Sequence, residues 1–262
     1  MANELSGRVA IVSGGARGIG LAIAQDLALH GASVVIIDSG VSIGGVDIVV
    51  NNAAILRDGF IFKAALDAWD AVIRTNLTGA YRLLAAATPV MREQLKGGRP
   101  PGAVINIVST AGIYGNFGQS AYGAAKAGLI GLTRVAAHDL ARSKITCNAV
   151  IPFAATRVTQ SIQPANEAQA AYKKKALEVS PLYVARLVSF LASPAAARVS
   201  GQLLGARGRE LFLFSQARPV MKQIVPSGGH DLPGMNAAMK AFEPSFCDLV
   251  TDLEAFSGDP VL

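Results

Sequence analysis

The chain has few of the residues that build metal sites and disulfide frameworks. It contains only two cysteines and three histidines among 262 residues. Cys147 and Cys247 lie far apart without a CxxC pair, and His30, His138 and His230 show no ligand spacing. This pattern gives no support to a zinc site, a disulfide-stapled fold or a catalytic histidine. We therefore expect no metal site, and two reduced cysteines with structural roles.

Long apolar runs and concentrated charge are also lacking. No uninterrupted stretch reaches the ~20 apolar residues that a membrane span needs, and the N-terminus has no charged-then-apolar leader. The net charge is +6, and the basic residues are scattered except for the triplet 173–175. We interpret that triplet as a solvated helix face rather than a docking patch for an acidic ligand. The sequence thus predicts a cytoplasmic protein with neither nucleic-acid nor membrane partners.

Hydrophobic residues make up 51% of the chain, and its length fits one compact α/β domain with a sizeable core. Apolar runs typical of buried parallel strands alternate with alanine-rich stretches typical of helices. The expected strands cover residues 9–12, 33–37, 46–50, 104–108 and 145–151, and the expected helices cover 20–29, 64–91, 122–142 and 181–191. Gly31 is well placed to end the first helix. The alternation predicts a Rossmann-type, doubly wound parallel sheet.

The periodicity fades near the C-terminus. From about Arg218 the sequence is repeatedly interrupted by proline and glycine. We therefore expect residues 1–217 to form the Rossmann domain. Residues 218–262 are expected to be a C-terminal extension that packs on this domain or on a neighbouring subunit.

A glycine-rich turn, SGGARGIG at residues 13–20, follows the first expected strand and opens directly into a helix. Glycines let the backbone approach a pyrophosphate, and the helix N-terminus offers free N–H groups and the positive end of its dipole. The turn therefore predicts a dinucleotide site. Its expected contacts are Gly14, Arg17, Gly18, Ile19 and Gly20.

Asp38 stands at the end of the second expected strand, 18 positions beyond Gly20. A carboxylate at this point accepts hydrogen bonds from the adenosine ribose and repels a 2′-phosphate, which favours NAD over NADP. Two other interpretations stay open: Asp38 could cap a turn, and Arg17 could pair with a phosphate and weaken the preference.

The connection after Asp38 is unusually short. Only residues 39–45 separate it from the strand expected at Val46, whereas a parallel crossover usually needs a dozen or more residues. These residues could cross the sheet but could not cover its face or supply a further strand. Either a segment is deleted, or residues are missing from the sequence. We favour the second explanation, because residues 44–47 resemble the end of an intact unit, and it predicts a break in the chain between Asp38 and Val46.

Three residues suggest a reaction centre. Tyr122 and Lys126 are four positions apart in an expected helix and project from the same face. An ammonium there lowers the tyrosine pKa from ~10 and makes the phenol a usable proton donor and acceptor. Ser109 closes the strand over 104–108 at its C-terminal end, where open α/β sheets bind their ligands. Its hydroxyl could hold a substrate oxygen beside Tyr122.

In this order the motifs resemble those of the short-chain dehydrogenase/reductase family, up to about Pro219. They are the loop over 13–20, the turn Asn51-Asn52-Ala53-Ala54, then Asn76, Ser109, Tyr122 and Lys126. The resemblance implies that Tyr122 protonates a carbonyl or deprotonates an alcohol while Ser109 positions it. It also implies that Lys126 binds the nicotinamide ribose and that Asn76 holds a water linking Lys126 to solvent.

The resemblance implies further contacts. Asn52, Ala53 and Ala54 would line the cofactor, and Pro152 and Thr156 would lie against the nicotinamide. Phe153 and the region that follows would form a substrate lid, although the family more often has Pro-Gly where this chain has Pro152-Phe153. A homodimer or homotetramer is also implied, paired through the helices that carry Asn76 and Tyr122.

A narrower resemblance is carried by Arg57-Asp58 and by the segments 152–159 and 208–214. These resemble the 3-hydroxyacyl-CoA dehydrogenase module of peroxisomal multifunctional enzymes and its bacterial relatives in lipid and steroid breakdown. The leading hypothesis is NAD-dependent oxidation of a secondary alcohol, or the reverse ketone reduction, with a 3-hydroxyacyl-CoA or a steroid- or lipid-derived substrate by analogy. The alternatives are a non-catalytic partner subunit of a dehydrogenase assembly and an NADPH-dependent 3-oxoacyl carrier-protein reductase.

Overall fold

The computed structural model describes residues 4–37, 45–155, 167–224, 231–256 and 258–262 of the chain. They belong to two compact units. The first comprises residues 1–214 together with 251–262, and the second comprises residues 215–250. The first unit contains the sheet and all four residues predicted to be catalytic.

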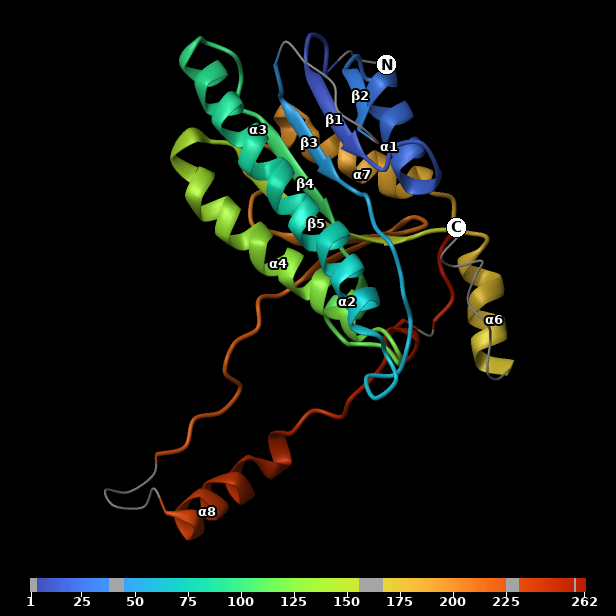
Figure 1. Cartoon of the computed structure of the whole chain (residues 1–262), viewed down its shortest axis with the longest axis vertical. Helices are drawn as coiled ribbons and strands as arrows, with labels where there is room; N and C mark the ends of the chain where they lie inside the picture. Colours follow the sequence, from blue (N-terminus) through green and yellow to red (C-terminus); the bar gives the residue numbers. More distant parts are fainter. Residues whose placement is uncertain (1–3, 38–44, 156–166, 225–230, 257) are drawn as a thin grey trace. The chain divides into compact units, whose positions relative to one another are not determined.

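One mixed sheet forms the centre of the first unit. Its strands are β1 (Val9–Ser13), β2 (Ser33–Ile37), β3 (Ile48–Asn51), β4 (Ala103–Ile107), β5 (Thr146–Phe153), β6 (Leu203–Arg207) and β7 (Glu210–Phe214). The strand order is β2-β1-β3-β4-β5-β6-β7 (Figure 1). All neighbours are parallel except β6 and β7, which form an antiparallel pair. The predicted doubly wound fold is confirmed, with β6 and β7 as strands that the sequence pattern did not predict.

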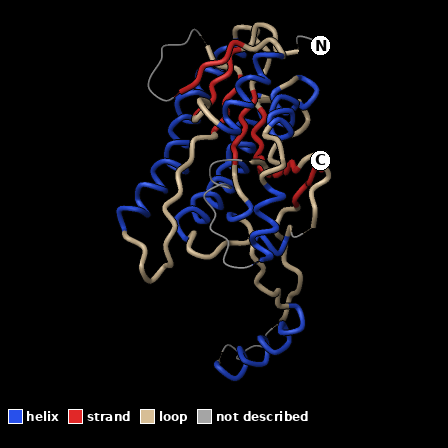
Figure 2. Tube along the Cα trace, turned by 90° about the vertical axis from the view of Figure 1, so that its right-hand side faces the viewer, coloured by secondary structure: helices blue, strands red, loops and turns tan. Residues whose placement is uncertain are grey.

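Helices cover both faces of this sheet, as Figure 2 shows. The covering helices are α1 (Gly18–Leu29), α2 (Leu66–Ile73), α3 (Gly79–Lys96), α4 (Ser120–Leu140) and α7 (Leu182–Ala192). Helix α6 (Glu167–Ala176) lies away from the sheet (Figure 1). Successive strand residues point to opposite faces. Ile48 and Val50 therefore share a buried cluster with residues of α1 and α7, whereas Val49 packs with residues of α3 and α4. Burial on both faces explains why the strands read as continuous apolar runs.

The region expected to be one helix over 64–91 is interrupted. α2 ends at Ile73, the residues Arg74–Thr78 form a π-helical turn, and α3 continues to Lys96. Single π turns inside α-helices are frequent at functional sites. Asn76 lies at the centre of this turn and is buried.

The start of β3 is held by a buried carboxylate. Asp47 accepts hydrogen bonds from the Val9 amide at 2.8 Å and from the Arg99 guanidinium at 2.6 Å. The side chain of Gln94 bonds both the amide and the carbonyl of Val46, at 2.7 and 2.8 Å. β3 is thereby fixed beside β1, which brings the residues after β3 to the loop after β1.

Residues 38–44 lie outside the described part of the chain. The predicted ribose contact of Asp38 and the predicted chain break therefore both concern residues that the structure does not describe. In the sequence, residues 38–47 alone connect β2 to β3. Within the described sheet, β2 is an edge strand.

The C-terminal extension is divided between the two units. Residues 251–262, which include the short helix α9 (Asp252–Ala255), belong to the first unit and bond to the β6–β7 hairpin. The second unit contains helix α8 (Leu232–Phe242), whose N-terminus is capped by the carboxylate of Asp231. No described helix combines the length and apolarity needed to cross a membrane.

The two cysteines differ in exposure. Cys147 is buried in β5, and burial raises the pKa of its thiol to about 12. Its predicted structural role agrees with this position. Cys247 is exposed in the second unit, and both thiols are free, so a structural role for Cys247 stays a prediction.

Candidate active site

The loop between β1 and α1 offers an open helix N-terminus. α1 begins at Gly18, and the residue before it, Arg17, makes no side-chain capping bond to the helix. The first amides of a helix are free to bind an anion when no side chain caps them. A Cβ on Gly18 would meet nothing within 4 Å, so the space beside this amide is open. A Cβ on Gly20 would lie 2.2 Å from the Gly14 carbonyl oxygen, so the loop can close on the helix only with glycine there.

The turn after β3 braces this loop. The side-chain amide of Asn52 donates to the carbonyls of Ser13 and Gly14, at 3.1 and 3.0 Å. The Ser13 hydroxyl accepts from the amides of Asn52 and Ala53 and donates to the Val50 carbonyl. Ser13 is a positioning residue that our sequence interpretation did not single out, although it is the first letter of the glycine-rich motif. The cradle formed by loop and turn fits the diphosphate of a dinucleotide.

Lys126 and Tyr122 form the centre of the site. Lys126 is 2% exposed, and its ammonium donates to the Ile107 carbonyl at 2.7 Å. Its Nζ lies 5.6 Å from the centroid of the Tyr122 ring. Burial lowers the pKa of Lys126 from 10.5 to about 8. A buried cation therefore lies between the end of β4 and the phenol of Tyr122, where it favours the phenolate form.

Ser109 is placed by a tight turn that packs on α4. Its hydroxyl accepts from the Ala111 amide at 3.2 Å and caps the short helix Thr110–Gly112. A Cβ on Gly112 would lie 2.7 Å from the Ala127 nitrogen and 2.8 Å from the Lys126 carbonyl carbon. Only glycine allows this approach, which brings the turn after Ser109 against the helix that carries Tyr122 and Lys126.

Asn76 connects the π turn to the segment after β3. Its Oδ1 accepts from the Ile55 amide at 2.9 Å, and its Nδ2 donates to the Ile55 carbonyl at 3.0 Å. Ile55 and Tyr122 pack against the same buried cluster, which includes Ala125 of α4. The structure thus places Asn76 beside α4, the helix of Tyr122 and Lys126, through Ile55. Its role in holding a water stays a prediction.

The remaining predicted contacts differ in how far the structure supports them. Pro152 and Phe153 end β5, paired with Ala206 and Arg207 of β6, at the same edge of the sheet as Ser109. Thr156 lies outside the described residues. Arg17 and Ala54 are exposed. Ile19 packs against the buried core, so a cofactor contact there would be made by its backbone.

Two aromatic residues near Phe153 were missed at the sequence level. The ring of Phe256, in the C-terminal segment, lies 4.6 Å from the ring of Phe153, and Tyr114 lies 6.1 Å from Phe256. Nothing in the local sequence distinguishes Phe256 from Phe242 or Phe246 in the same extension. Only its ring contacts in the tertiary structure distinguish Phe256 from the other two.

The fold and site together define a nucleotide-dependent oxidoreductase with a tyrosine–lysine centre. Sequence comparison with known proteins supports this class. The family model described as enoyl-(acyl carrier protein) reductase matches residues 38–208. Hydroxyacyl-CoA dehydrogenase ChsB1 of Mycobacterium tuberculosis is 36% identical over 258 residues, covering 81% of either chain. The 3-oxoacyl-[acyl-carrier-protein] reductase FabG of Vibrio cholerae is 35% identical over 243 residues, covering 78% of this chain and 98% of the relative.

A solved structure supports the same assignment. The crystal structure of a short chain dehydrogenase from Mycobacterium avium matches with a TM-score of 0.79 and 28% identity, covering 94% of this chain and 98% of that one. The chain belongs to the short-chain dehydrogenase/reductase family. It is an NAD(P)-dependent oxidoreductase acting on CH–OH groups.

The phosphate loop gives a test with a matched control. Gly18 and Gly7 both have positive φ, +56° and +74°, and a Cβ on either would meet nothing within 4 Å. Alanine at either position should cost about 1 kcal/mol of stability, because the left-handed conformation is strained for it. Only Gly18→Ala places a methyl group in the space assigned to the diphosphate, so NADH affinity should fall roughly tenfold.

Fluorescence titration of NADH and thermal unfolding of both variants would check this prediction. Equal NADH affinities in Gly18→Ala and Gly7→Ala would show that the cofactor does not use this loop.

Proposed function

We propose that the chain catalyses the NAD-dependent oxidation of a 3-hydroxyacyl thioester to the 3-oxoacyl thioester, or the reverse reduction. The observation that carries this proposal is the buried Lys126 ammonium, held by the Ile107 carbonyl and facing the ring of Tyr122. A surface lysine at this spacing would be screened by solvent, whereas a buried one acts through a low dielectric. It therefore gives Tyr122 the electrostatic environment of a general acid and base.

Each residue has a defined part in the reaction. In the oxidative direction Tyr122 removes the hydroxyl proton of the substrate, while Ser109 holds the substrate oxygen by a hydrogen bond. Lys126 stabilises the phenolate that accepts this proton. The nicotinamide cofactor supplies the acceptor for the hydride that leaves the carbinol carbon. The products are a ketone, the reduced cofactor and a proton.

The preference for NAD rests on Asp38. Asp38 follows β2 directly in the sequence, and a carboxylate at this point of a dinucleotide-binding motif repels a 2′-phosphate and accepts bonds from ribose hydroxyls. The loop from β1 to α1 supports the diphosphate, and Pro152 at the end of β5 supports the nicotinamide side. NADPH use is the alternative, and a comparison of kcat/KM with the two cofactors would decide between them.

The substrate class is proposed from the relatives. One relative is named a hydroxyacyl-CoA dehydrogenase and another a 3-oxoacyl-[acyl-carrier-protein] reductase. Both names describe an oxygenated acyl thioester. In the first name the acyl group is carried by CoA, and in the second by acyl carrier protein. The narrower sequence motifs favour the CoA thioester. A carrier-protein reductase using NADPH is the second candidate function.

A substrate panel tests this proposal. We expect the highest kcat/KM for NADH formation with a 3-hydroxyacyl-CoA, compared with hydroxysteroids, simple secondary alcohols and 3-hydroxyacyl carrier protein. Absorbance of the reduced cofactor measures each rate. A preference for a simple alcohol or for a free hydroxysteroid would refute the thioester assignment. A preference for the carrier-protein thioester with NADPH would support the second candidate.

We also propose a homodimer or homotetramer. In support, apolar side chains are exposed on α2 and α3, at Leu66, Trp69 and Tyr81, and on β7, at Leu211 and Leu213. Clusters of exposed apolar side chains mark interaction surfaces. Light scattering should give a mass of two or four chains, and a monomer at micromolar concentration would contradict the proposal.

A further inference from the structure

An aromatic cluster joins the C-terminal segment to the end of β5. Phe256 is only 9% exposed although it lies near the end of the chain. Its ring centroid lies 4.6 Å from that of Phe153, 5.5 Å from Phe212 and 6.2 Å from Phe214. Tyr114 meets the same ring edge to face at 6.1 Å. These separations are those of interacting aromatic pairs.

The position of this cluster relates it to the reaction centre. Phe153 follows Pro152 at the C-terminal end of β5, and Tyr114 lies in the segment between Ser109 and Tyr122. Ligands of open α/β sheets bind outside the carboxyl ends of the strands. Phe256 therefore packs on Phe153, the last residue of β5, and on Tyr114, which follows β4, at the edge of the sheet where folds of this kind bind their ligands.

The segment that carries Phe256 is anchored to the β6–β7 hairpin. The Arg207 guanidinium donates to the carbonyls of Phe256 at 3.2 Å and Gly258 at 2.9 Å, and it also pairs with Glu210. The Arg209 amide donates to the Val261 carbonyl at 2.7 Å. Hydrogen bonds from Arg207 hold the pKa of the Glu210 carboxyl below its usual value, so this carboxylate stays charged and keeps Arg207 in place.

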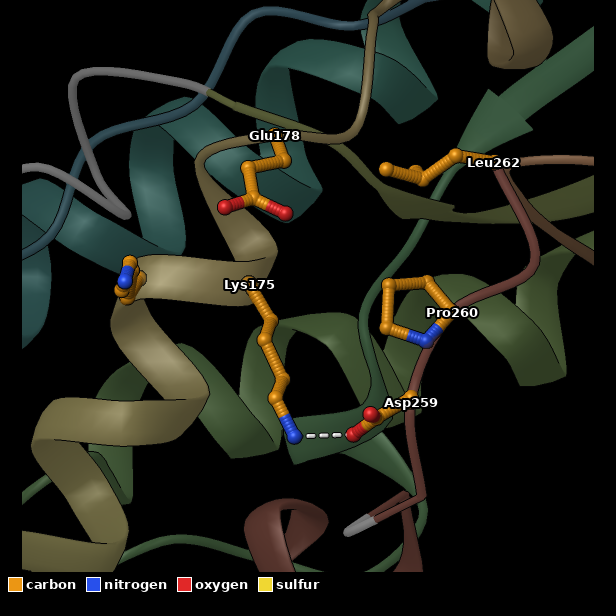
Figure 3. Close-up of a pocket in the computed structure, with 6 residues that line it drawn as sticks. Lys175, Glu178, Asp259, Pro260 and Leu262 are labelled. Atoms are coloured by element: carbon orange, nitrogen blue, oxygen red, sulfur yellow. Dashed lines mark hydrogen bonds and ion pairs between the residues drawn. The ribbon is translucent and has the colours of Figure 1, made fainter.

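The opposite side of the segment faces α6 (Figure 3). Lys175 of α6 forms an ion pair with Asp259, and a cavity opens beside this pair. Lys174, Glu178, Pro260 and Leu262 complete its lining. The segment is thus held between the aromatic cluster and a helix of the region that the family resemblance assigns to the substrate lid.

We propose that the C-terminal segment 251–262 forms one wall of the substrate site, and that Phe256 limits the size of the acyl group that the site accepts. This inference rests on the proposed function, since it assigns the acyl pocket of that same site. The family model ends at residue 208. The segment 251–262 lies beyond the residues that the family model matches, and it is separate from the residues to which we assign the chemistry.

Substitutions of Phe256 that change its volume in opposite directions test the proposal. Phe256→Ala should raise the ratio of kcat/KM for a long-chain 3-hydroxyacyl-CoA over a short-chain one by roughly tenfold or more, because it opens the pocket wall. Phe256→Trp should lower the same ratio. NADH affinity should stay unchanged in both variants, because the ring partners of Phe256 belong to the aromatic cluster and not to the phosphate loop. Phe246→Ala is the matched control, since Phe246 is 61% exposed and lies in the second unit.

If Phe256→Ala fails to fold, Phe256→Leu replaces it, because leucine keeps most of the apolar contact. The ratio of kcat/KM for the long-chain over the short-chain substrate should rise in this variant too. An unchanged ratio in folded variants, or an equal loss with every chain length, would overturn the proposal. Failure of the proposed function is recognised separately, because the wild-type protein would then turn over no acyl thioester. In that case the same variants are compared on small and bulky members of whichever secondary alcohols the wild type oxidises, with the same expected shift.

Discussion

Tyr122→Phe is expected to lower kcat about a thousandfold, because the substitution removes the proton donor and acceptor while keeping the ring. General acid–base catalysis by a positioned side chain contributes roughly 10²–10⁴ to a rate. The ring of Tyr122 packs against the cluster of Val72, Ala121 and Ala125, so phenylalanine should preserve the fold. NADH affinity should change less than about threefold, which corresponds to less than ~1 kcal/mol. Steady-state kinetics and NADH titration measure the two effects.

Tyr81→Phe provides the control for this substitution. Tyr81 is 57% exposed on α3. Loss of its hydroxyl should leave kcat and NADH affinity unchanged. Turnover by Tyr122→Phe at the rate of the Tyr81→Phe control would remove Tyr122 from the mechanism.

Lys126→Met is expected to lower activity strongly and to stabilise the fold at the same time. Methionine has a similar length but carries no charge, so the variant avoids burying an ammonium. A shift of the Lys126 pKa from 10.5 to about 8 corresponds to about 3 kcal/mol against folding at neutral pH. Loss of the bond to the Ile107 carbonyl costs about 1 kcal/mol. The variant should therefore gain about 2 kcal/mol in the free energy of unfolding at pH 7, and kcat should fall at least about a hundredfold.

The stabilisation should depend on pH with a definite sign. Lys126 keeps its proton up to about pH 8 in the folded chain and up to 10.5 in the unfolded chain. Between these values the unfolded state binds more protons, so this group makes the wild type more stable as the pH rises. The advantage of Lys126→Met should therefore shrink above pH 8 and be lost by about pH 10.5.

Denaturant unfolding of the wild type and of Lys126→Met across this pH range measures the difference in their free energies of unfolding. The contributions of the other titrating groups largely cancel in this difference. Lys96→Met, at a lysine side chain that is 74% exposed, should give a small difference that does not vary with pH. If Lys126→Met were less stable than the wild type at neutral pH, the interactions of the buried ammonium would have to outweigh its desolvation cost, contrary to the prediction.

The strands were largely predictable from the sequence because they are buried on both faces. Their continuous apolar runs gave β1 to β5 with ends that differ by at most a few residues from the structure. β6 and β7 were missed since Gly205 and Gly208 interrupt the apolar pattern and since Arg207 and Glu210 place charges inside it. In the structure these two charges pair with each other across the hairpin. This ion pair reduces the free-energy cost of placing two charged side chains in the hairpin, a cost that argued against a strand at the sequence level.

The positions of the residues that we propose to be catalytic were predictable because their spacing is set by local structure. Tyr122 and Lys126 share one helical face, and Ser109 follows β4 two residues after its end at Ile107. The supporting contacts were not predictable in this way. The π turn around Asn76 depends on a bond to Ile55, and the place of Phe256 depends on a cluster formed by three distant segments.

We propose that the substrate's carbinol hydrogen would move directly to the bound nicotinamide while Tyr122 takes the hydroxyl proton. The most direct test uses a 3-hydroxyacyl-CoA that carries deuterium on the carbinol carbon, with mass analysis of the reduced cofactor. We expect one deuterium in each NADH formed by the wild type and almost no NADH with Tyr122→Phe. NADH that carries no deuterium, or deuterium released to water, would contradict it.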